Sequence, residues 1–214
     1  ALEEIRKIDA MVIDKTGTLT EKSNSEGKDE VLKPHVQEAM DALKTQGVNI
    51  YLCSGDKEDR VASIAHEAHI THYRSEVLPQ DKELLVRELQ QEGRHVAMVG
   101  DGINDSQALA IADVSIAMGK GTDVAMEVAQ VTLMGNDLRR IPEALSMSKK
   151  TVHMIHQNLF WAFIYNMVCI PLAAGIPCLF GVSWQITPMW ASALMAFSSV
   201  SVVLNSLRLR FVDN

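Results

Sequence analysis

Charged side chains are absent from a long stretch of this 214-residue sequence. No Asp, Glu, Lys or Arg occurs between Thr151 and Leu207, although the chain contains 27 acidic and 20 basic residues. The mean hydropathy of +0.04 therefore averages a charged front part with an apolar tail. The net charge of −7 argues against a general nucleic-acid-binding protein.

Cysteine is also scarce, and its positions exclude a metal-binding cysteine cluster. Cys53, Cys169 and Cys178 show no Cys-x-x-Cys or other metal-binding spacing. An odd count without a disulfide framework fits a reducing cytosol around the front part, and we interpret the two cysteines of the tail as packing residues. The sequence shows no signal peptide and no initiating Met, so we expect a fragment or a processed chain.

Short apolar runs alternate with helical patterns through residues 1–137, which predicts βαβ units and a parallel sheet. The predicted strands cover residues 10–13, 48–53, 95–99, 114–117 and 131–134, with a weaker candidate near Tyr73. Apolar residues at helical spacing predict helices over residues 36–43, 60–68, 82–91 and 106–112. The fold class is therefore α/β, and such sheets bind ligands at the carboxyl ends of their strands.

Polar and acidic residues follow three of the predicted strands at those ends. The motifs are Asp14-Lys15-Thr16-Gly17-Thr18-Leu19-Thr20, Ser54-Gly55-Asp56 and Gly100-Asp101-Gly102-Ile103-Asn104-Asp105. Lys82 lies between the last two motifs along the chain. We expect these acidic groups, the hydroxyl and the lysine to meet at one edge of the sheet, where they are suited to bind a phosphate and a cation.

The seven residues that begin at Asp14 match the phosphorylation signature of the P-type ATPases. Taken singly, each of the other motifs has an ordinary explanation: Ser54 as a turn residue, Lys82 as a solvated helix residue, Asp105 as a helix cap. Taken together and in this order, the motifs resemble the four-part set of the haloacid-dehalogenase-like, Rossmann-like fold.

The resemblance implies a role for each motif. Asp14 is the nucleophile and forms an aspartyl phosphate. The hydroxyl of Ser54 donates a hydrogen bond to the phosphoryl group, and Lys82 supplies a positive charge. Asp14, Asp101 and the carbonyl of Thr16 hold Mg²⁺, a hard ion that prefers oxygen ligands. The resemblance also implies that Asn104 and Asp105 orient the cation site. The residues that it implies for cofactor binding are Lys15, Thr16, Gly17, Thr18, Gly55, Asp56, Gly100 and Gly102.

Two positions bear on the kind of reaction. The family usually has Thr-Gly-Asp where this sequence has Ser54-Gly55-Asp56, so the hydroxyl is retained. Hydrolytic relatives often carry an Asp two residues after the nucleophile as a general acid/base, and this sequence has Thr16 there. We therefore expect a long-lived phosphoenzyme, which suits a pump intermediate better than a phosphatase.

The tail, residues 138–214, predicts a linking helix followed by a two-helix transmembrane hairpin. Its uncharged apolar runs cover residues 159–179 and 186–207, and each is long enough to cross a bilayer as a helix. A buried pair of soluble helices is the alternative, but little protein would remain to cover it. Lys149 and Lys150 before the first span and Arg208 and Arg210 after the second predict cytoplasmic ends. We expect a multi-pass protein of the cell membrane with a cytoplasmic phosphorylation domain.

Polar and soft side chains lie in the middle of both predicted spans. Tyr165 and Asn166 lie in the first, and Met195, Ser198 and Ser199 lie in the second. Small hydroxylated residues also favour helix packing, so Ser198 and Ser199 alone leave both interpretations open. The pairing of Tyr-Asn with Met-x-x-Ser-Ser resembles the copper(I) subgroup of the heavy-metal P-type ATPases. It implies Cu⁺ binding by Tyr165, Asn166, Met195 and Ser199, and Ag⁺ would fit the same ligands.

The resemblance covers almost the whole chain, but the chain contains only part of such a pump. The stretch between about residues 21 and 30 is too short for the nucleotide-binding domain that the family inserts there. The Thr-Gly-Glu loop of the actuator and the Cys-Pro-Cys membrane helix are also absent.

We therefore expect the phosphorylation domain and last two membrane helices of an ATP-driven copper(I) export pump. Its partners would be the lipid bilayer, the missing domains and a copper chaperone. Two alternatives stay open: a membrane-anchored phosphohydrolase, and a non-transporting truncated or regulatory relative.

Overall fold

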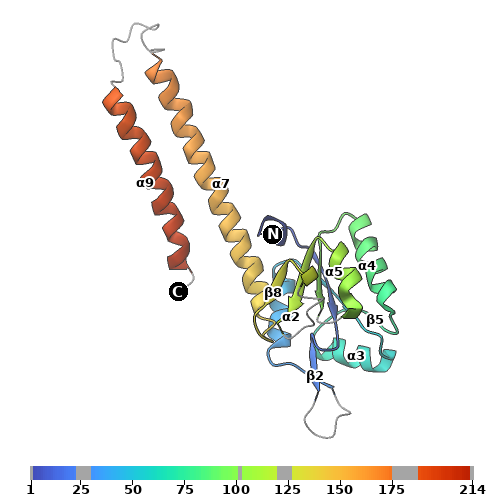
Figure 1. Ribbon diagram of the computed structural model, residues 1–214. Helices are drawn as coiled ribbons and strands as arrows, with labels where there is room; N and C mark the ends of the chain where they lie inside the picture. The colour runs from blue at the N-terminus through green and yellow to red at the C-terminus, as the bar shows by residue number, and fades with distance from the viewer. Residues whose placement is uncertain (1, 23–29, 101–102, 120–126, 175–187, 213–214) are drawn as a thin grey trace. The chain divides into compact units, whose positions relative to one another are not determined.

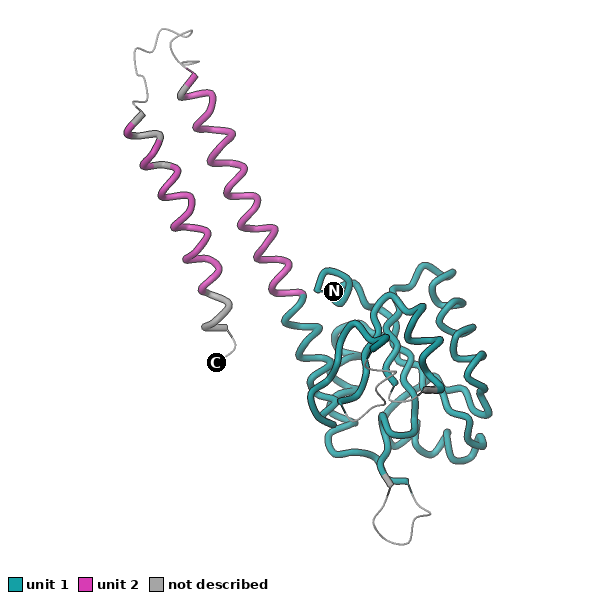
Figure 2. The backbone as a smooth tube through the Cα atoms, viewed as in Figure 1, with its two compact units in different colours: residues 1–148 teal, residues 149–214 magenta. Residues whose placement is uncertain are grey.

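The computed structural model describes residues 2–22, 30–100, 103–119, 127–174 and 188–212. The chain divides into two compact units, Ala1–Ser148 and Lys149–Asn214 (Figure 2). The first unit is a layered α/β domain, and the second consists of two helices (Figure 1).

Six parallel strands form the sheet of the first unit in the order β5-β4-β1-β6-β7-β8. The central strand β1 lies between β4 and β6, and its last residue, Asp14, pairs with Cys53 of β4. The parallel α/β sheet expected from the sequence is confirmed, including the weaker strand near Tyr73. The strands are β1 (Ala10–Asp14), β4 (Asn49–Cys53), β5 (His72–Arg74), β6 (Val96–Gly100), β7 (Val114–Met118) and β8 (Val131–Leu133).

Helices cover both faces of this sheet, which explains why its central strands β1 and β6 are buried along their whole length. Met11 and Ile13 of β1 share one core with α2 (Val36–Thr45), α3 (Glu58–Glu67) and the first turns of α7 (Arg140–Ala173). Ala10 and Val12 share the other core with α4 (Pro79–Gln91) and α5 (Ser106–Ile111). The alternation of side chains along one strand thus builds two cores.

A short antiparallel hairpin, which the sequence did not predict, follows the first motif. It consists of β2 (Thr20–Lys22) and β3 (Glu30–Leu32), with Lys22 paired to Glu30. Residues 23–29, where we expected the nucleotide-binding domain to be missing, lie outside the described residues. The hairpin brings Glu30 close to the motif that begins at Asp14, because Thr20 is both the end of the motif and the start of β2.

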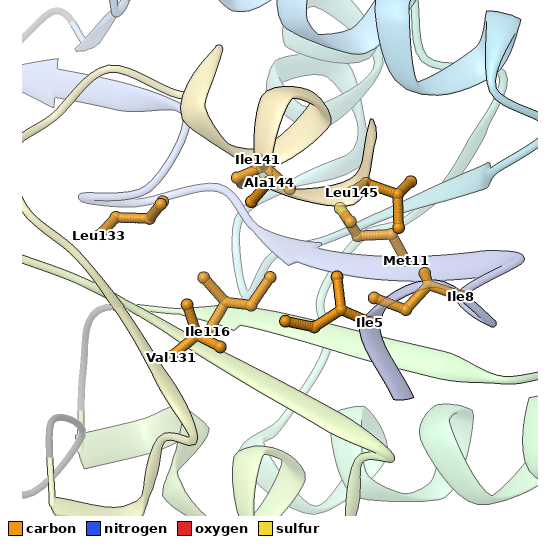
Figure 3. A pocket seen from close by; sticks show the side chains of 9 residues that line it. All are labelled: Ile5, Ile8, Met11, Ile116, Val131, Leu133, Ile141, Ala144 and Leu145. Atoms are coloured by element: carbon orange, nitrogen blue, oxygen red, sulfur yellow. The ribbon is translucent and has the colours of Figure 1, made fainter. Parts of the chain in front are cut away.

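A small apolar cavity lies between the sheet and the first turns of α7 (Figure 3). Its volume is about 20 Å³, and none of its lining side chains is polar. The N-terminal helix α1 (Leu2–Ile5) contributes Ile5 to its lining, and the hydroxyl of Ser148 donates a hydrogen bond to the carbonyl of Leu2. A void of this size and polarity is a packing feature of the core and offers nothing to a polar ligand. It is lined by Ile5, Ile8, Met11, Ile116, Val131, Leu133, Ile141, Ala144 and Leu145.

The second unit consists of the rest of α7 and α9 (Pro188–Val212). Asn158 on α7 hydrogen-bonds both Asn205 and Ser206 on α9, so the two helices are neighbours, and they run antiparallel (Figure 1). Among the described residues, no helix is both long and apolar enough to cross a membrane, so the expected transmembrane hairpin is not confirmed. The first expected span contains the polar residues Tyr165 and Asn166 and ends outside the described residues, and the second begins outside them.

Cys53 provides a test of the buried end of β4. It is fully buried, and burial raises the pKa of its thiol to about 12. Because the thiolate is the form that reacts, Cys53 should resist iodoacetamide at about pH 8 in the folded chain and react readily after urea unfolding. Mass spectrometry of the alkylated peptide measures both rates. Equal rates before and after unfolding would contradict this placement of β4.

Candidate active site

Three neighbouring strands end at the predicted site. Asp14 is the last residue of β1, Gly100 is the last residue of β6, and Ser54 directly follows β4. The strand order changes direction around β1, and open α/β sheets bind ligands in the crevice at such a point. Asp14 is 7% exposed and Ser54 is 3% exposed, so both polar side chains are largely withdrawn from water.

Lys82 connects two of the predicted motifs. Its ammonium group contacts the carboxylate of Asp14 and lies 2.7 Å from Oδ1 of Asp105. The start of α4 is held by the carboxylate of Asp81, which accepts a hydrogen bond from the backbone N–H of Leu78 at 2.8 Å. Burial alone would lower the pKa of Lys82, but the two carboxylates outweigh burial and raise it. A fixed positive charge therefore lies between two buried carboxylates.

Lys15 forms a second ionic cluster beside the first. Its buried ammonium group pairs with the carboxylates of Asp56 and Glu30. Burial alone would lower the pKa of Lys15, and these two acids raise it. Glu30 is a site residue that sequence reasoning missed, because only the pairing of β2 with β3 brings it here. No local pattern in the sequence signals that contact.

The turn after Asp14 is organised by backbone contacts. Gly17 adopts a φ of 77°, a conformation that glycine tolerates without a steric penalty. The hydroxyl of Thr20 donates to the carbonyl oxygen of Lys15 at 3.1 Å. The side chain of Thr16 is exposed, whereas the hydroxyl of Thr18 is buried and has no hydrogen-bond partner among the described residues. An unpaired buried hydroxyl is costly, and an oxygen atom of a ligand would satisfy it.

Two of the predicted glycines have little room for a side chain. A Cβ atom on Gly100 would lie 2.6 Å from Oδ2 of Asp105, and one on Gly55 would lie 3.3 Å from a backbone carbonyl oxygen. The hydroxyl oxygen of Ser54 accepts a hydrogen bond from the backbone N–H of Asp56 at 3.2 Å. The glycines therefore allow the motif loops to pack closely around the site.

The predicted Mg²⁺ site lies partly outside the described residues. Asp101 and Gly102 are not among them, and Asn104 is exposed. Within the described part of the chain, no group of three His, Cys, Asp or Glu side chains is arranged to hold a metal ion. The two carboxylates that Lys82 bridges are hard oxygen donors at the same edge of the sheet, so the residues present fit Mg²⁺ chemically.

The four predicted copper ligands occur in the second unit. Tyr165 is half-buried, whereas Asn166, Met195 and Ser199 are exposed. Asn166 donates a hydrogen bond to the carbonyl of Ala162 at 3.0 Å, and Ser199 donates to the carbonyl of Met195 at 3.2 Å. The two helices by themselves therefore do not bury these four side chains together.

Sequence comparisons connect this geometry with known proteins. Residues 23–113 match one family model of haloacid dehalogenase-like hydrolases, and residues 82–145 match a second model of the same description. The chain is 49% identical over 183 residues to the probable copper-transporting ATPase PacS of Synechocystis sp., covering 85% of this chain and 24% of the relative. It is 50% identical over 181 residues to copper-transporting ATPase 2 of Mus musculus, covering 85% of this chain and 12% of the relative.

A comparison of structures points in the same direction for the fold. A zinc-transporting PIB-type ATPase in the E2.Pi state matches with a TM-score of 0.82 and 22% sequence identity. The match covers 98% of this chain and 51% of that chain. Of the two copper-transporting relatives named above, the chain spans only about a quarter of the length or less. From the sequence identity over 85% of its length, together with the haloacid dehalogenase-like fold, the chain belongs to the P-type ATPase family.

Proposed function

We propose that this chain is the phosphorylated part of an ATP-driven copper(I) export pump. The observation that carries the proposal is the place of Asp14, at the carboxyl end of the central strand and in contact with Lys82, which also holds Asp105. The names of the relatives, which are copper-transporting ATPases, support the choice of transported ion.

In the proposed reaction, Asp14 attacks the γ-phosphorus of ATP. A carboxylate oxygen of Asp14 forms the new P–O bond, the bond to the β,γ-bridging oxygen breaks, and ADP leaves. Phosphoryl transfer depends mainly on positioning and on charge stabilisation, and the ammonium group of Lys82 supplies a positive charge. The hydroxyls of Ser54 and Thr18 are available as donors to the phosphoryl oxygens.

Mg²⁺ belongs to the same proposal. Asp14, Asp101 and the carbonyl of Thr16 would hold it, with Asn104 and Asp105 orienting the site. When bound, the ion neutralises negative charge on the phosphoryl oxygens. Lys82 keeps the Asp14 and Asp105 side chains in place for this role.

The second unit would contribute part of a soft-metal site within the membrane. Thioether sulfur suits a soft monovalent ion, so we assign Cu⁺, and Ag⁺ as a substitute, to Tyr165, Asn166, Met195 and Ser199. Because the last three side chains are exposed, they could share a metal ion with ligands from other parts of the pump. Large apolar side chains such as Phe160 (58% exposed) and Phe197 (68% exposed) cover both helices and support a lipid or protein surrounding.

The remaining parts of the pump are partners in this proposal. Because the chain spans 24% of the PacS relative, a nucleotide-binding domain, an actuator and further membrane helices would come from elsewhere in the protein. A copper chaperone would deliver the ion. The first unit would lie in the cytoplasm, where ATP is available, and the pump in the cell membrane.

A haloacid dehalogenase-like phosphohydrolase is the second candidate, and the family models that match residues 23–113 and 82–145 favour it. A hydrolase would require a general acid/base near the nucleophile to release phosphate by water attack. Thr16 occupies the position where hydrolytic relatives often carry an acid, and it cannot serve as a base at neutral pH.

Trapping of the acyl phosphate distinguishes the two functions. We expect the complete protein in membranes to incorporate the γ-phosphate of ATP in a form that hydroxylamine removes, when Cu⁺ or Ag⁺ is present. Acid-quenched, radiolabelled protein separated by electrophoresis measures this incorporation.

Zn²⁺ is the control ion in this experiment. Phosphorylation driven by Zn²⁺ alone would reject copper as the transported ion. Rapid, metal-independent hydrolysis of p-nitrophenyl phosphate without a trapped acyl phosphate would instead favour the phosphohydrolase.

A further inference from the structure

Four polar side chains connect the helices of the second unit. Nδ2 of Asn205 on α9 donates hydrogen bonds to Oδ1 of Asn158 at 2.8 Å and to Oε1 of Gln157 at 3.3 Å. Nδ2 of Asn158 donates in turn to Oγ of Ser206 at 2.9 Å. These contacts occur in a stretch with no Asp, Glu, Lys or Arg between Thr151 and Leu207. We refer to these four residues as the amide clamp.

The amide clamp determines how far one helix can slide along the other. Apolar side chains tolerate small shifts, because one methyl group packs about as well as the next. Hydrogen bonds between amides do not tolerate such shifts. A slip of one residue moves each donor about 1.5 Å along the helix axis and turns it by about 100° away from its acceptor. Interhelical hydrogen bonds of this kind therefore specify register as well as adding modest stability.

The clamp lies two helical turns from two of the polar positions identified in the sequence. Tyr165 follows Asn158 by seven residues, and Ser198 precedes Asn205 by seven residues. Seven residues make about two turns, so each pair lies on one face of its helix. All four side chains are half-buried, as expected for the face on which two helices pack. The antiparallel register therefore places Tyr165 at the level of Ser198, about 10 Å from the clamp.

The remaining predicted copper ligands fall on one side of this interface. Asn166 follows Tyr165 by one residue, and Ser199 follows Ser198 by one residue. One residue corresponds to a rotation of about 100° around the helix axis. Because the helices are antiparallel, both rotations lead to the same side of the helix pair. Met195 lies one turn before Ser199 and shares its face. All three side chains are exposed, in agreement with this placement. The open side of the helix pair thus gathers an amide, a hydroxyl and a thioether within about one turn of one another.

We propose that Asn158 and Asn205 are positioning residues for the soft-metal site, because their hydrogen bond aligns the ligands of α7 with those of α9. The inference rests on the proposed copper site. A shift of register by one residue would move Asn166 away from Met195 and Ser199 in both height and direction. Neither asparagine is among the proposed copper ligands, so each would act only through the alignment of the helices.

Replacement of the clamp residues by leucine, which has a similar volume, tests this role. We expect Asn205→Leu to weaken Cu⁺ binding by the complete protein by about tenfold, the lower end of losses for residues that orient metal ligands. Competition against a chromophoric Cu⁺ chelator measures the affinity. The matched control is Ser201→Ala on the same helix, since Ser201 donates to the carbonyl of Ser198 within its own helix. This variant should bind Cu⁺ as the wild type does.

Two further variants make the result decisive. Asn158→Leu should match Asn205→Leu, and the double variant should be no worse than either single one, because both partners of the bond are then apolar. X-ray absorption at the copper edge should show fewer sulfur ligands in the variants, a change that general destabilisation alone would not produce.

Met195→Ala separates this inference from the function on which it rests. If Met195→Ala weakens Cu⁺ binding while both leucine variants stay within twofold of the wild type, the clamp has no positioning role. If Met195→Ala itself leaves the affinity unchanged, the copper site is wrong, and the clamp's role falls with it.

Discussion

Asp14→Asn is expected to abolish incorporation of phosphate from ATP. The amide of asparagine is no nucleophile toward phosphorus at neutral pH, whereas the carboxylate of Asp14 lies at the carboxyl end of the central strand beside Lys82. The chain should still fold, because Lys82 keeps its ion pair with Asp105 at 2.7 Å. Acid-quench labelling with radioactive ATP should therefore show no acyl phosphate in a protein whose circular dichroism spectrum is unchanged.

Asp9→Asn is the matched control for this result. Asp9 lies just before β1, and its carboxylate accepts a hydrogen bond from the backbone N–H of His95 at 2.8 Å, away from the site. Its amide variant should be labelled as the wild type is. Labelling of Asp14→Asn to the same extent would show that another residue accepts the phosphate, and the proposed mechanism would be wrong.

Lys82→Met is expected to destabilise the chain by about 3–5 kcal/mol and to prevent phosphorylation. Removal of the ammonium group leaves the carboxylates of Asp14 and Asp105 buried side by side without a compensating charge. Repulsion between these two negative charges would displace the carboxylate of Asp14 from its position. Urea unfolding followed by circular dichroism measures the loss of stability.

Arg87→Met on the same helix is the control for this loss. Arg87 is exposed and pairs with Glu83 one turn away, and such pairs contribute about 0.3–0.5 kcal/mol. A loss below about 1 kcal/mol in Lys82→Met would mean that the buried pair of carboxylates is not held by Lys82 in solution.

The pH dependence of the Lys82 contribution has a definite sign. The carboxylates raise the pKa of Lys82 in the folded chain above its value in the unfolded chain. Its stabilisation should therefore be fully present below the unfolded value of about 10.4 and be lost as the pH rises through the higher folded value. The difference in unfolding free energy between wild type and Lys82→Met should stay constant from about pH 7 to 9 and shrink at higher pH.

The sheet and the site motifs were predictable for a physical reason. Strands that are buried on both faces appear in the sequence as continuous apolar runs, as in residues 10–13 and 96–99. The carboxyl ends of parallel strands lie at one edge, so residues that follow those runs must meet there. The sequence therefore predicts that Asp14, Ser54 and Asp105 lie at the same edge of the sheet.

Glu30 could not be found in this way, because its role depends on a hairpin. Its pairing with Lys15 requires β3 to return antiparallel to β2, and nothing in the local sequence specifies that register. The partners of the buried lysines were also unpredictable. A lysine beside several acids fits many ion pairs, and only the packing of α4 selects Asp14 and Asp105 for Lys82.

By itself, the sequence determined the α/β class, the motif order around Asp14 and the separation of a charged part from an uncharged tail, because these depend on hydrophobic periodicity and composition. The tertiary structure decided which charges pair and which faces of α7 and α9 meet. Those choices depend on contacts between residues far apart in the chain, such as Lys15 with Asp56 and Asn158 with Asn205. Periodicity shows that a helix has a face, but only packing shows what that face touches.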